Sequence, residues 1–290
     1  MSTAEAVRTP GPRRRVLSRT PLARAHDQLL AVRVVGRPKP VPWSRFERAR
    51  YPAEALGLAR QAMTALAAGE YGAVVGFAKV AAALALRGAP FDLVALATRV
   101  PTDELRHAEL ALRMAALLGG GDADDVPLAP DLARLEREDP CRWELTALDA
   151  LMAEVPAISE TMAAALIAAC RERASDPVAR ALFSSLLADE VHHARLGWYY
   201  LMWRAPQWTR AERQAVADRV GVLVAGIEHR FWRGRDASAG ARAAAAALGV
   251  LDSEGQRAAV AAVMEREIVP ALDALGLGAS HAWQRRRRGG

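Results

Sequence analysis

D-E-L-R-H-A-E-L occupies residues 103–110, and D-E-V-H-H-A-R-L occupies residues 189–196, so the pattern D-E-x-x-H-A-x-L occurs twice in the chain. Residues three apart lie on one face of an α-helix. Each copy therefore places a carboxylate, Glu104 or Glu190, beside an imidazole, His107 or His193. This pairing is common among ligands of first-row transition metals. The repeat predicts two metal ions, or one shared metal site.

Composition and breaker residues favour an all-α protein. The chain has 290 residues, and 52% of them are hydrophobic, which is enough for a sizeable core. Alanine-rich runs and few aromatic residues favour close-packed helices over a sheet. Glycine and proline signals at 87–90, 119–121 and 175–177 mark helix ends. The expected long helices are 52–86, 91–118, 142–173 and 177–204, with shorter ones at 209–232 and 253–274 and a crossing connection at 119–140.

Four regions follow from this pattern. They are an irregular basic arm rich in proline and arginine (1–50), a four-helix bundle (51–204), accessory helices packed on it (205–276), and a loose basic tail (277–290). The net charge of +6 is concentrated at the ends, because residues 1–50 contain 12 Arg and Lys against 3 Asp and Glu. The body is net acidic, so we expect no nucleic-acid partner.

The cysteines and the N-terminal sequence indicate a cytoplasmic protein. Cys141 and Cys170 lack C-x-x-C spacing, so neither a disulfide framework nor a rubredoxin-type iron site is expected. Three arginines at 13–15 are followed by charged residues and proline rather than by the apolar segment of an export signal. No run of about 18 uncharged apolar residues predicts a membrane span.

Helix geometry adds two glutamates to the candidate site. Residues of two antiparallel helices lie at one height when the turn is halfway between them in the sequence. Reflection of Glu104 through the turn near Arg87 leads to Glu70, and reflection of Glu190 through Ser175 leads to Glu160. Both glutamates lie in apolar stretches, where an unpaired charge is costly. The predicted ligands are Glu70, Glu104, His107, Glu160, Glu190 and His193.

This set resembles the ferritin-like di-metal carboxylate superfamily, in which two helices each supply a glutamate and two others each supply Glu-x-x-His. The resemblance covers residues 55–204. Two E-x-x-H motifs are closer to oxygenases, rubrerythrins and bacterioferritins than to ordinary ferritin. D-E-L-R-H is also similar to the D-E-x-R-H signature of di-iron monooxygenase hydroxylase subunits, which are much longer than this chain. The implied fold is a ferritin-like four-helix bundle with a long crossover between its second and third helices.

The resemblance also implies roles for residues beside the ligands. Asp103 and Asp189 would each accept a hydrogen bond from the histidine of the opposite motif and so fix its tautomer. Arg106 would steady one of these aspartates. His192 stands in the second motif where Arg106 stands in the first, so the two surroundings are not expected to be symmetric.

Other local features leave two interpretations open. Pro101 and Pro156 each precede a candidate ligand by about one turn, and they either aim Glu104 and Glu160 or are incidental kinks. Small residues around Glu70 serve close helix packing or leave room for a substrate. Four aromatic residues near the end of the fourth helix form core and rim, or one of them borders a substrate entrance. They are Trp198, Tyr199, Tyr200 and Trp203.

The implied function is that of a di-iron oxidase or oxygenase. Two iron ions, bridged by Glu104 and Glu190, would activate O₂ and oxidise a small organic substrate. An electron-donor protein and a homo-oligomer are expected partners. One alternative is a ferroxidase that handles or stores iron, although the C-terminal helices would have to fit outside a storage shell. Another is a di-manganese catalase or peroxidase acting on peroxide, since the ligands also accept manganese. A non-enzymatic helical adaptor is the fourth, which the complete ligand set disfavours.

Overall fold

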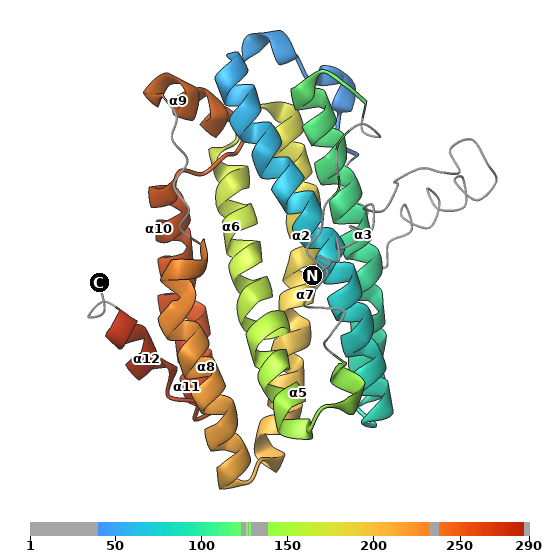
Figure 1. Cartoon of the computed structure of the whole chain (residues 1–290), viewed down its shortest axis with the longest axis vertical. Coiled ribbons are helices and arrows are strands. Elements are labelled where there is room, and N and C mark those ends of the chain that lie inside the picture. Colours follow the sequence, from blue (N-terminus) through green and yellow to red (C-terminus); the bar gives the residue numbers. More distant parts are fainter. Residues whose placement is uncertain (1–39, 123–125, 127, 129–138, 232–237, 287–290) are drawn as a thin grey trace, which may run out of the picture.

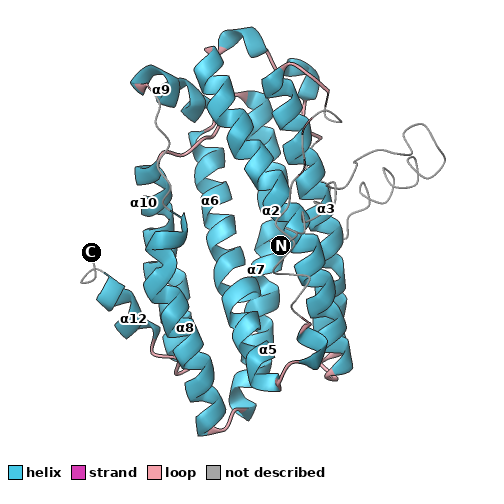
Figure 2. Cartoon of the chain, viewed as in Figure 1, coloured by secondary structure: helices cyan, strands magenta, loops and turns pink. Residues whose placement is uncertain are grey.

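The computed structural model describes residues 40–122, 126, 128, 139–231 and 238–286, and every regular element in these ranges is helical (Figure 2). The all-α expectation is confirmed. The long elements are α2 (Ala53–Leu86), α3 (Phe91–Gly119), α5 (Leu145–Met152), the π-helical segment η5 (Ala153–Ser159), α6 (Glu160–Arg173), α7 (Pro177–Arg204) and α8 (Arg210–Phe231). Towards the C-terminus follow α9 (Ala239–Ala247), α10 (Ser253–Val263), the π-helical segment η7 (Met264–Ile268), α11 (Val269–Ala274) and α12 (Ala279–Arg285).

Helix boundaries lie where the breaker residues predicted them. Gly88 and Gly120 have φ of 66° and 74°, so they end α2 and α3 in the left-handed region that favours glycine. Asp176 caps α7, because its carboxylate accepts hydrogen bonds from two backbone amides at 2.8 and 2.9 Å. Pro177 occupies the first turn of that helix, where a missing amide hydrogen is not needed.

The helices α2, α3, α6 and α7 run lengthwise through the molecule, and α8 also runs lengthwise (Figure 1). α2 packs along α3, α6 packs along α7, and α3 meets α7. α3 ends at the top of Figure 1 and α5 begins at the bottom, so the connection between them joins opposite ends of the body. Most of that connection, 123–125, 127 and 129–138, lies outside the described residues.

The hydrophobic core is divided into two clusters at one level of the body. In α3, one cluster ends at Val100 and the other begins at Ala111. In α7, the corresponding residues are Leu196 and Leu186. The intervals between them contain both repeats of D-E-x-x-H. The repeated motif therefore interrupts an apolar core on two facing helices.

The C-terminal region is more ordered than the sequence predicted. α12 lies within the tail that was expected to be loose from 277, and it packs on α8 with Trp283 only 6% exposed. Apolar residues of the tail, Leu277, Ala279 and Ala282, are buried beside it, which explains the difference. The alanine-rich run at 239–247 forms the separate helix α9 against α2, which was not predicted.

The basic arm extends to residue 50, but only its last part is described. Residues 1–39 lie outside the described ranges. Trp43–Arg45 and Arg48–Arg50 form short 3₁₀ turns, and Val41 is buried. Arg113 of α3 lies over the Trp43 ring at 4.8 Å. This part of the arm is packed against the body rather than irregular.

Two helical runs have the length and apolar composition of a membrane span, although charged residues interrupt both, so neither contains 18 consecutive uncharged residues. They are α2 and the run Leu145–Arg173, each with a window that contains at most two charged residues. The core helix of a globular protein passes the same test, and each run carries one of the candidate ligands, Glu70 or Glu160.

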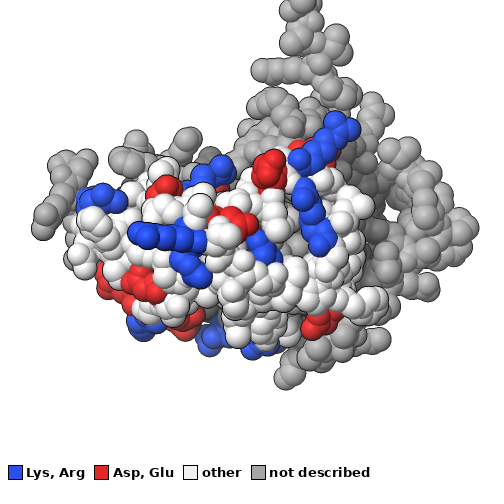
Figure 3. Space-filling view, turned by 90° about the horizontal axis from the view of Figure 1, so that it is seen from below, with Lys and Arg blue, Asp and Glu red and all other residues white. Residues whose placement is uncertain are grey.

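At the lower end of the molecule, described acidic and basic side chains are interspersed (Figure 3).

Candidate metal centre

Four side chains of the repeated motif meet in the interior. Glu104 and His107 come from α3, and Glu190 and His193 come from α7. Each is at most 1% exposed. One ligand atom from each lies within 4.8 Å of the other three. This buried group of two glutamates and two histidines is compatible with a pair of metal ions.

Each histidine faces the glutamate of the opposite helix. His107 Nδ1 lies 3.0 Å from Glu190 Oε1, and His193 Nδ1 lies 3.1 Å from Glu104 Oε1. The distances within each motif are longer, 3.5 Å in α3 and 3.7 Å in α7. The Nδ1 atoms therefore point into the cluster, and the two glutamates lie between the histidines.

Glu70 and Glu160 border this cluster from α2 and from the start of α6. Glu160 Oε2 lies 4.0 Å from His193 Nδ1, and its side chain is 12% exposed. Glu160 also contacts Glu190, and Glu70 contacts Glu104. The structure thus brings all six predicted ligands to one level, with Glu70 and Glu160 outside the tightest group of four.

The two aspartates face the far side of the histidine rings in crossed pairs. His107 Nε2 lies 3.3 Å from Asp189 Oδ2, and His193 Nε2 lies 3.5 Å from Asp103 Oδ2. The family resemblance implied a hydrogen bond in each crossed pair. His107 makes this hydrogen bond with Asp189, whereas His193 Nε2 lies near Asp103 but has no hydrogen-bond partner. With Nε2 turned to a carboxylate, Nδ1 is the nitrogen left for a metal.

Different arginines hold the two aspartates. Arg106 of α3 reaches across to Asp189, with Nη1 2.6 Å from Oδ2, and it also donates to Ser185 of α7. Asp103 is held instead by Arg99, one turn earlier on its own helix, with Nε 3.0 Å from Oδ2. Sequence reasoning missed both Arg99 and Ser185. The i, i+4 spacing of Arg99 and Asp103 was a signal for the first pair.

Residues that the sequence placed outside the ligand set remain outside this cluster. His192, which occupies the position of Arg106 in the second motif, is partly buried. Glu109 and Glu154 are also partly buried and interact with other groups. None of these three side chains belongs to the buried group of four.

The close contacts between histidines and carboxylates shift the pKa values of both. Burial lowers the pKa of each motif histidine, but interactions with the facing aspartate and both motif glutamates outweigh it and raise the pKa well above its ordinary value. Burial raises the pKa of Glu104 and Glu190, but their interactions with the two histidines lower it below the ordinary value. These interactions favour the cationic form of each motif histidine and the ionised form of each motif glutamate.

The pKa values of the two bordering glutamates, Glu70 and Glu160, shift upward, opposite to those of Glu104 and Glu190. Burial, followed by the charge of Glu104, raises the pKa of Glu70 well above its ordinary value. Burial and the charges of Glu104 and Glu190 do the same for Glu160. Four carboxylates at one level cannot all remain ionised without compensating positive charge. Where no metal ion is bound, protons on Glu70 and Glu160 would reduce the negative charge.

Unsatisfied ligand atoms indicate that the site fits metal ions. The buried side-chain atoms without a hydrogen-bond partner include Glu104 Oε2, Glu190 Oε2 and the Nδ1 atoms of His107 and His193. Leaving such atoms unpaired in a core costs about 1–3 kcal/mol each. Oxygen and imidazole nitrogen are suitable donors for iron, manganese or zinc. Metal ions would satisfy atoms that the protein leaves without partners.

Asp149 is a buried carboxylate outside the candidate centre, and both of its oxygens have hydrogen-bond partners. Asp149 is fully buried, and it accepts hydrogen bonds from Tyr200 at 2.6 Å, Arg204 at 2.9 and 3.0 Å, and Trp208 at 2.7 Å. Sequence analysis did not identify this group, because its members are far apart in the chain. Its donors satisfy both carboxylate oxygens, so the group joins α5 to the end of α7 and has the features of a structural contact.

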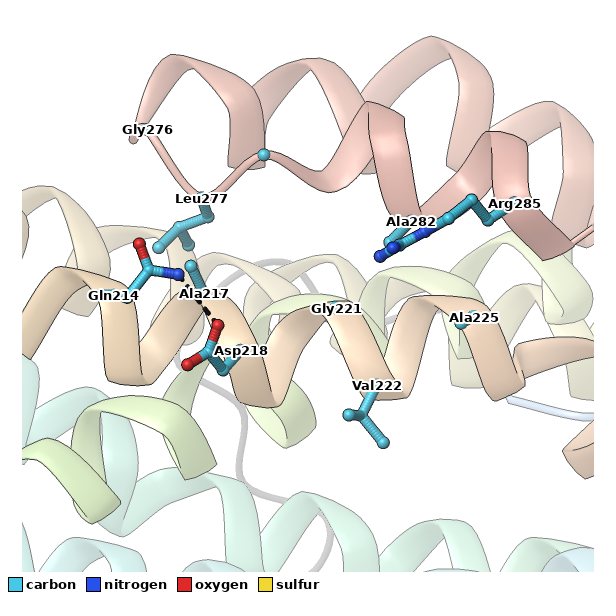
Figure 4. Close-up of a pocket in the computed structure, with 11 residues that line it drawn as sticks. Gln214, Ala217, Asp218, Gly221, Val222, Ala225, Gly276, Leu277, Ala282 and Arg285 are labelled. Carbon is cyan, nitrogen blue, oxygen red and sulfur yellow. Dashed lines mark hydrogen bonds between the residues drawn. The ribbon is translucent and has the colours of Figure 1, made fainter.

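A cleft of about 540 Å³ lies elsewhere, between α8 and the segment leading into α12 (Figure 4). Its wall includes Asp218, which accepts a hydrogen bond from Gln214 at 2.9 Å, and Arg285. None of the predicted ligands is among its lining residues. The cleft is therefore separate from the candidate metal centre.

Comparison of the chain with protein-family models, curated proteins and solved structures finds no match.

Proposed function

We propose that the protein is a ferritin-like di-iron oxidase or oxygenase. The observation that carries the proposal is the crossed arrangement of the repeated motif. Each histidine has one nitrogen toward the opposite glutamate at 3.0–3.1 Å and the other toward the opposite aspartate at 3.3–3.5 Å. A solvated charged face would not require buried, reciprocal pairs of this kind.

Residues at the level of the cluster would share the ligation of two metal ions. Glu104 and Glu190, which lie between the histidines, would serve as ligands to both ions. His107 and Glu70 would complete one position, and His193 and Glu160 the other. Four ionised glutamates would balance the charge of two divalent ions, and the histidines would bind as neutral imidazoles, because metal binding displaces the protons of these groups. Bound iron would supply the electrons that reduce O₂.

The protein's own contribution is orientation and the exclusion of water. Asp103 and Asp189 hold the imidazoles with Nδ1 inward, and Arg99 and Arg106 hold the aspartates. Apolar clusters lie above and below, and the Phe77 ring is 6.4 Å from the His193 ring. These surroundings suit an organic substrate better than a hydrated ion. A cytoplasmic location, a protein electron donor and a homo-oligomer remain parts of the proposal.

Metal analysis tests the central claim. Protein purified after iron loading should contain close to two metal ions per chain, and the double variant Glu104→Ala/Glu190→Ala should contain none. Glu172→Ala is the matched control, because Glu172 is an exposed glutamate of α6. Wild-type protein that stays free of metal after loading with either iron or manganese would contradict the proposal.

Turnover assays separate the alternatives. Consumption of O₂ by the Fe(II) protein without growth of a mineral core supports the oxidase or oxygenase. Accumulation of a mineral core would instead indicate a ferroxidase, and rapid disproportionation of H₂O₂ by the Mn(II) protein would indicate a catalase.

A further inference from the structure

Glu160 begins α6 immediately after the π-helical segment η5 (Ala153–Ser159). Its backbone amide donates to the carbonyl of Val155, five residues earlier, so Glu160 itself closes a π turn. A π turn contains an extra residue compared with an α turn. The side-chain direction of Glu160 therefore depends on the persistence of this widened turn.

Local side chains satisfy part of the widened segment. Pro156 lies within it and has no amide hydrogen to donate. The hydroxyl of Ser159 donates to the Glu154 carbonyl at 2.9 Å, and that of Thr161 donates to the Ala157 carbonyl at 2.5 Å. These bonds compensate for regular α-helical bonds that the segment lacks.

Gly197 of α7 brings the neighbouring backbone against this segment. A Cβ at Gly197 would lie 2.1 Å from the Ala157 nitrogen and 2.4 Å from the Pro156 carbonyl carbon. Both are backbone atoms, so a rotamer change cannot relieve the clash. Gly197 is one turn beyond His193 on α7, and Ala157 is one turn before Glu160. The close contact is thus adjacent to the metal level.

Trp198 adds a second connection between the same two elements. Its indole Nε1 donates to Thr161 Oγ1 at 3.0 Å. Thr161 is 8% exposed and directly follows Glu160. Its hydroxyl accepts this bond while donating to Ala157, so one hydroxyl links α7 to both sides of Glu160.

We propose that Gly197 and Trp198 are positioning residues that direct Glu160 toward the metal held with Glu190 and His193. The inference rests on the proposed function, in which Glu160 is a ligand. It predicts an effect confined to one of the two metal positions. Glu70 provides the contrast, because it lies in the uninterrupted helix α2 and a Cβ at the adjacent Gly69 would meet no atom within 4 Å.

Titration of the full-length metal-free protein with Co(II), followed by its visible absorption, tests this inference. Wild type should bind two ions. Trp198→Phe keeps an aromatic ring but removes the donor, and it should weaken one site about 10- to 100-fold, as expected when a residue that orients a ligand is changed. The visible absorption of the Co(II) ion in that site should also differ from its absorption in the wild-type protein. Glu160→Gln should affect the same site.

The matched variants separate positioning from general destabilisation. Thr161→Val should weaken the second site as much as Trp198→Phe does, and the double variant should weaken it little further. Thr161→Ser keeps the hydroxyl and should bind the second ion as wild type does. Gly197→Ala should act like Trp198→Phe if it folds, while Gly69→Ala should bind both ions as wild type does. Circular dichroism checks folding in each case.

Two results would overturn the inference in distinguishable ways. Wild type that binds two ions, together with Trp198→Phe and Thr161→Val proteins that bind both with unchanged affinity and spectrum, contradicts the positioning role alone. Wild type that binds fewer than two ions contradicts the proposed function and removes the inference with it.

Discussion

The two halves of the candidate centre share a motif but differ in their surroundings. The half formed by α2 and α3 contains Glu70, Glu104 and His107 on uninterrupted helices. The half formed by η5, α6 and α7 contains Glu160, Glu190 and His193, and it includes a π-helical segment. Similar candidate ligands are thus presented by different backbones. The comparison shows that repeated chemistry does not require repeated support.

The support of the aspartates differs in the same way. Asp103 of the first half is paired within its own helix, whereas Asp189 of the second half is paired with Arg106 from the first half. Asp189 of the second half therefore depends on the first half for the positive charge that pairs with it. Substitutions on the two sides should have unequal effects.

The largest expected difference is in stability. Arg106→Met should lower the free energy of unfolding by about 3 kcal/mol, because it leaves the buried Asp189 without this partner. Arg99→Met should cost about 1 kcal/mol, since Arg99 is 25% exposed against 13% for Arg106 and water screens its ion pair more. Urea unfolding of the metal-free proteins measures both. Equal losses would show that the cross-helix pair has no special importance.

A smaller difference should appear in metal affinity. Asp189→Asn and Asp103→Asn each remove a negative charge facing a histidine, and each should weaken metal binding about 10-fold or more. Asp189→Asn should have the larger effect, because it also disrupts the contact with Arg106. Competition with a chelator measures the affinities, with Asp252→Asn at the exposed cap of α10 as a control for the substitution. A larger effect of Asp103→Asn would reverse the proposed order.

The smallest difference should be in pH dependence. The pKa values of both histidines and of Glu70 and Glu160 are raised, so these groups hold protons that metal ions must displace. Metal affinity should therefore rise with pH and fall in acid, and binding should release protons. Each half contains one histidine and one glutamate whose pKa is raised. The affinity of both metal positions should therefore change with pH in the same way. Titration calorimetry in buffers of different ionisation enthalpy counts the protons, and affinity independent of pH would contradict the expectation.

Much of the fold was predictable because its signals are local. Gly88, Gly120 and Asp176 act within one or two turns, so the sequence located the ends of the long helices. The tail was harder to predict. Trp283 is buried in a helix that packs on α8 and α11, and a short run before four arginines contains no sign of those contacts.

In the candidate centre, too, local spacing predicted some residues, whereas contacts between helices determined others. Three-residue spacing predicted each Glu and His pair, and reflection through the turns placed Glu70 and Glu160 at the same level. Arg99 could have been identified from its spacing to Asp103. Ser185 and the Gly197 contact could not, since both depend on how closely two helices approach.

The sequence by itself determined the helices and the faces that carry the repeated glutamates and histidines, because helical periodicity acts over a few residues. The family resemblance already implied the crossed aspartate–histidine pairs, but only the tertiary structure decided that Arg106 pairs with Asp189 and Arg99 with Asp103. It also decided where α7 touches the π segment before Glu160. Those contacts join residues distant in the chain, and they depend on distances between helices that no local pattern encodes.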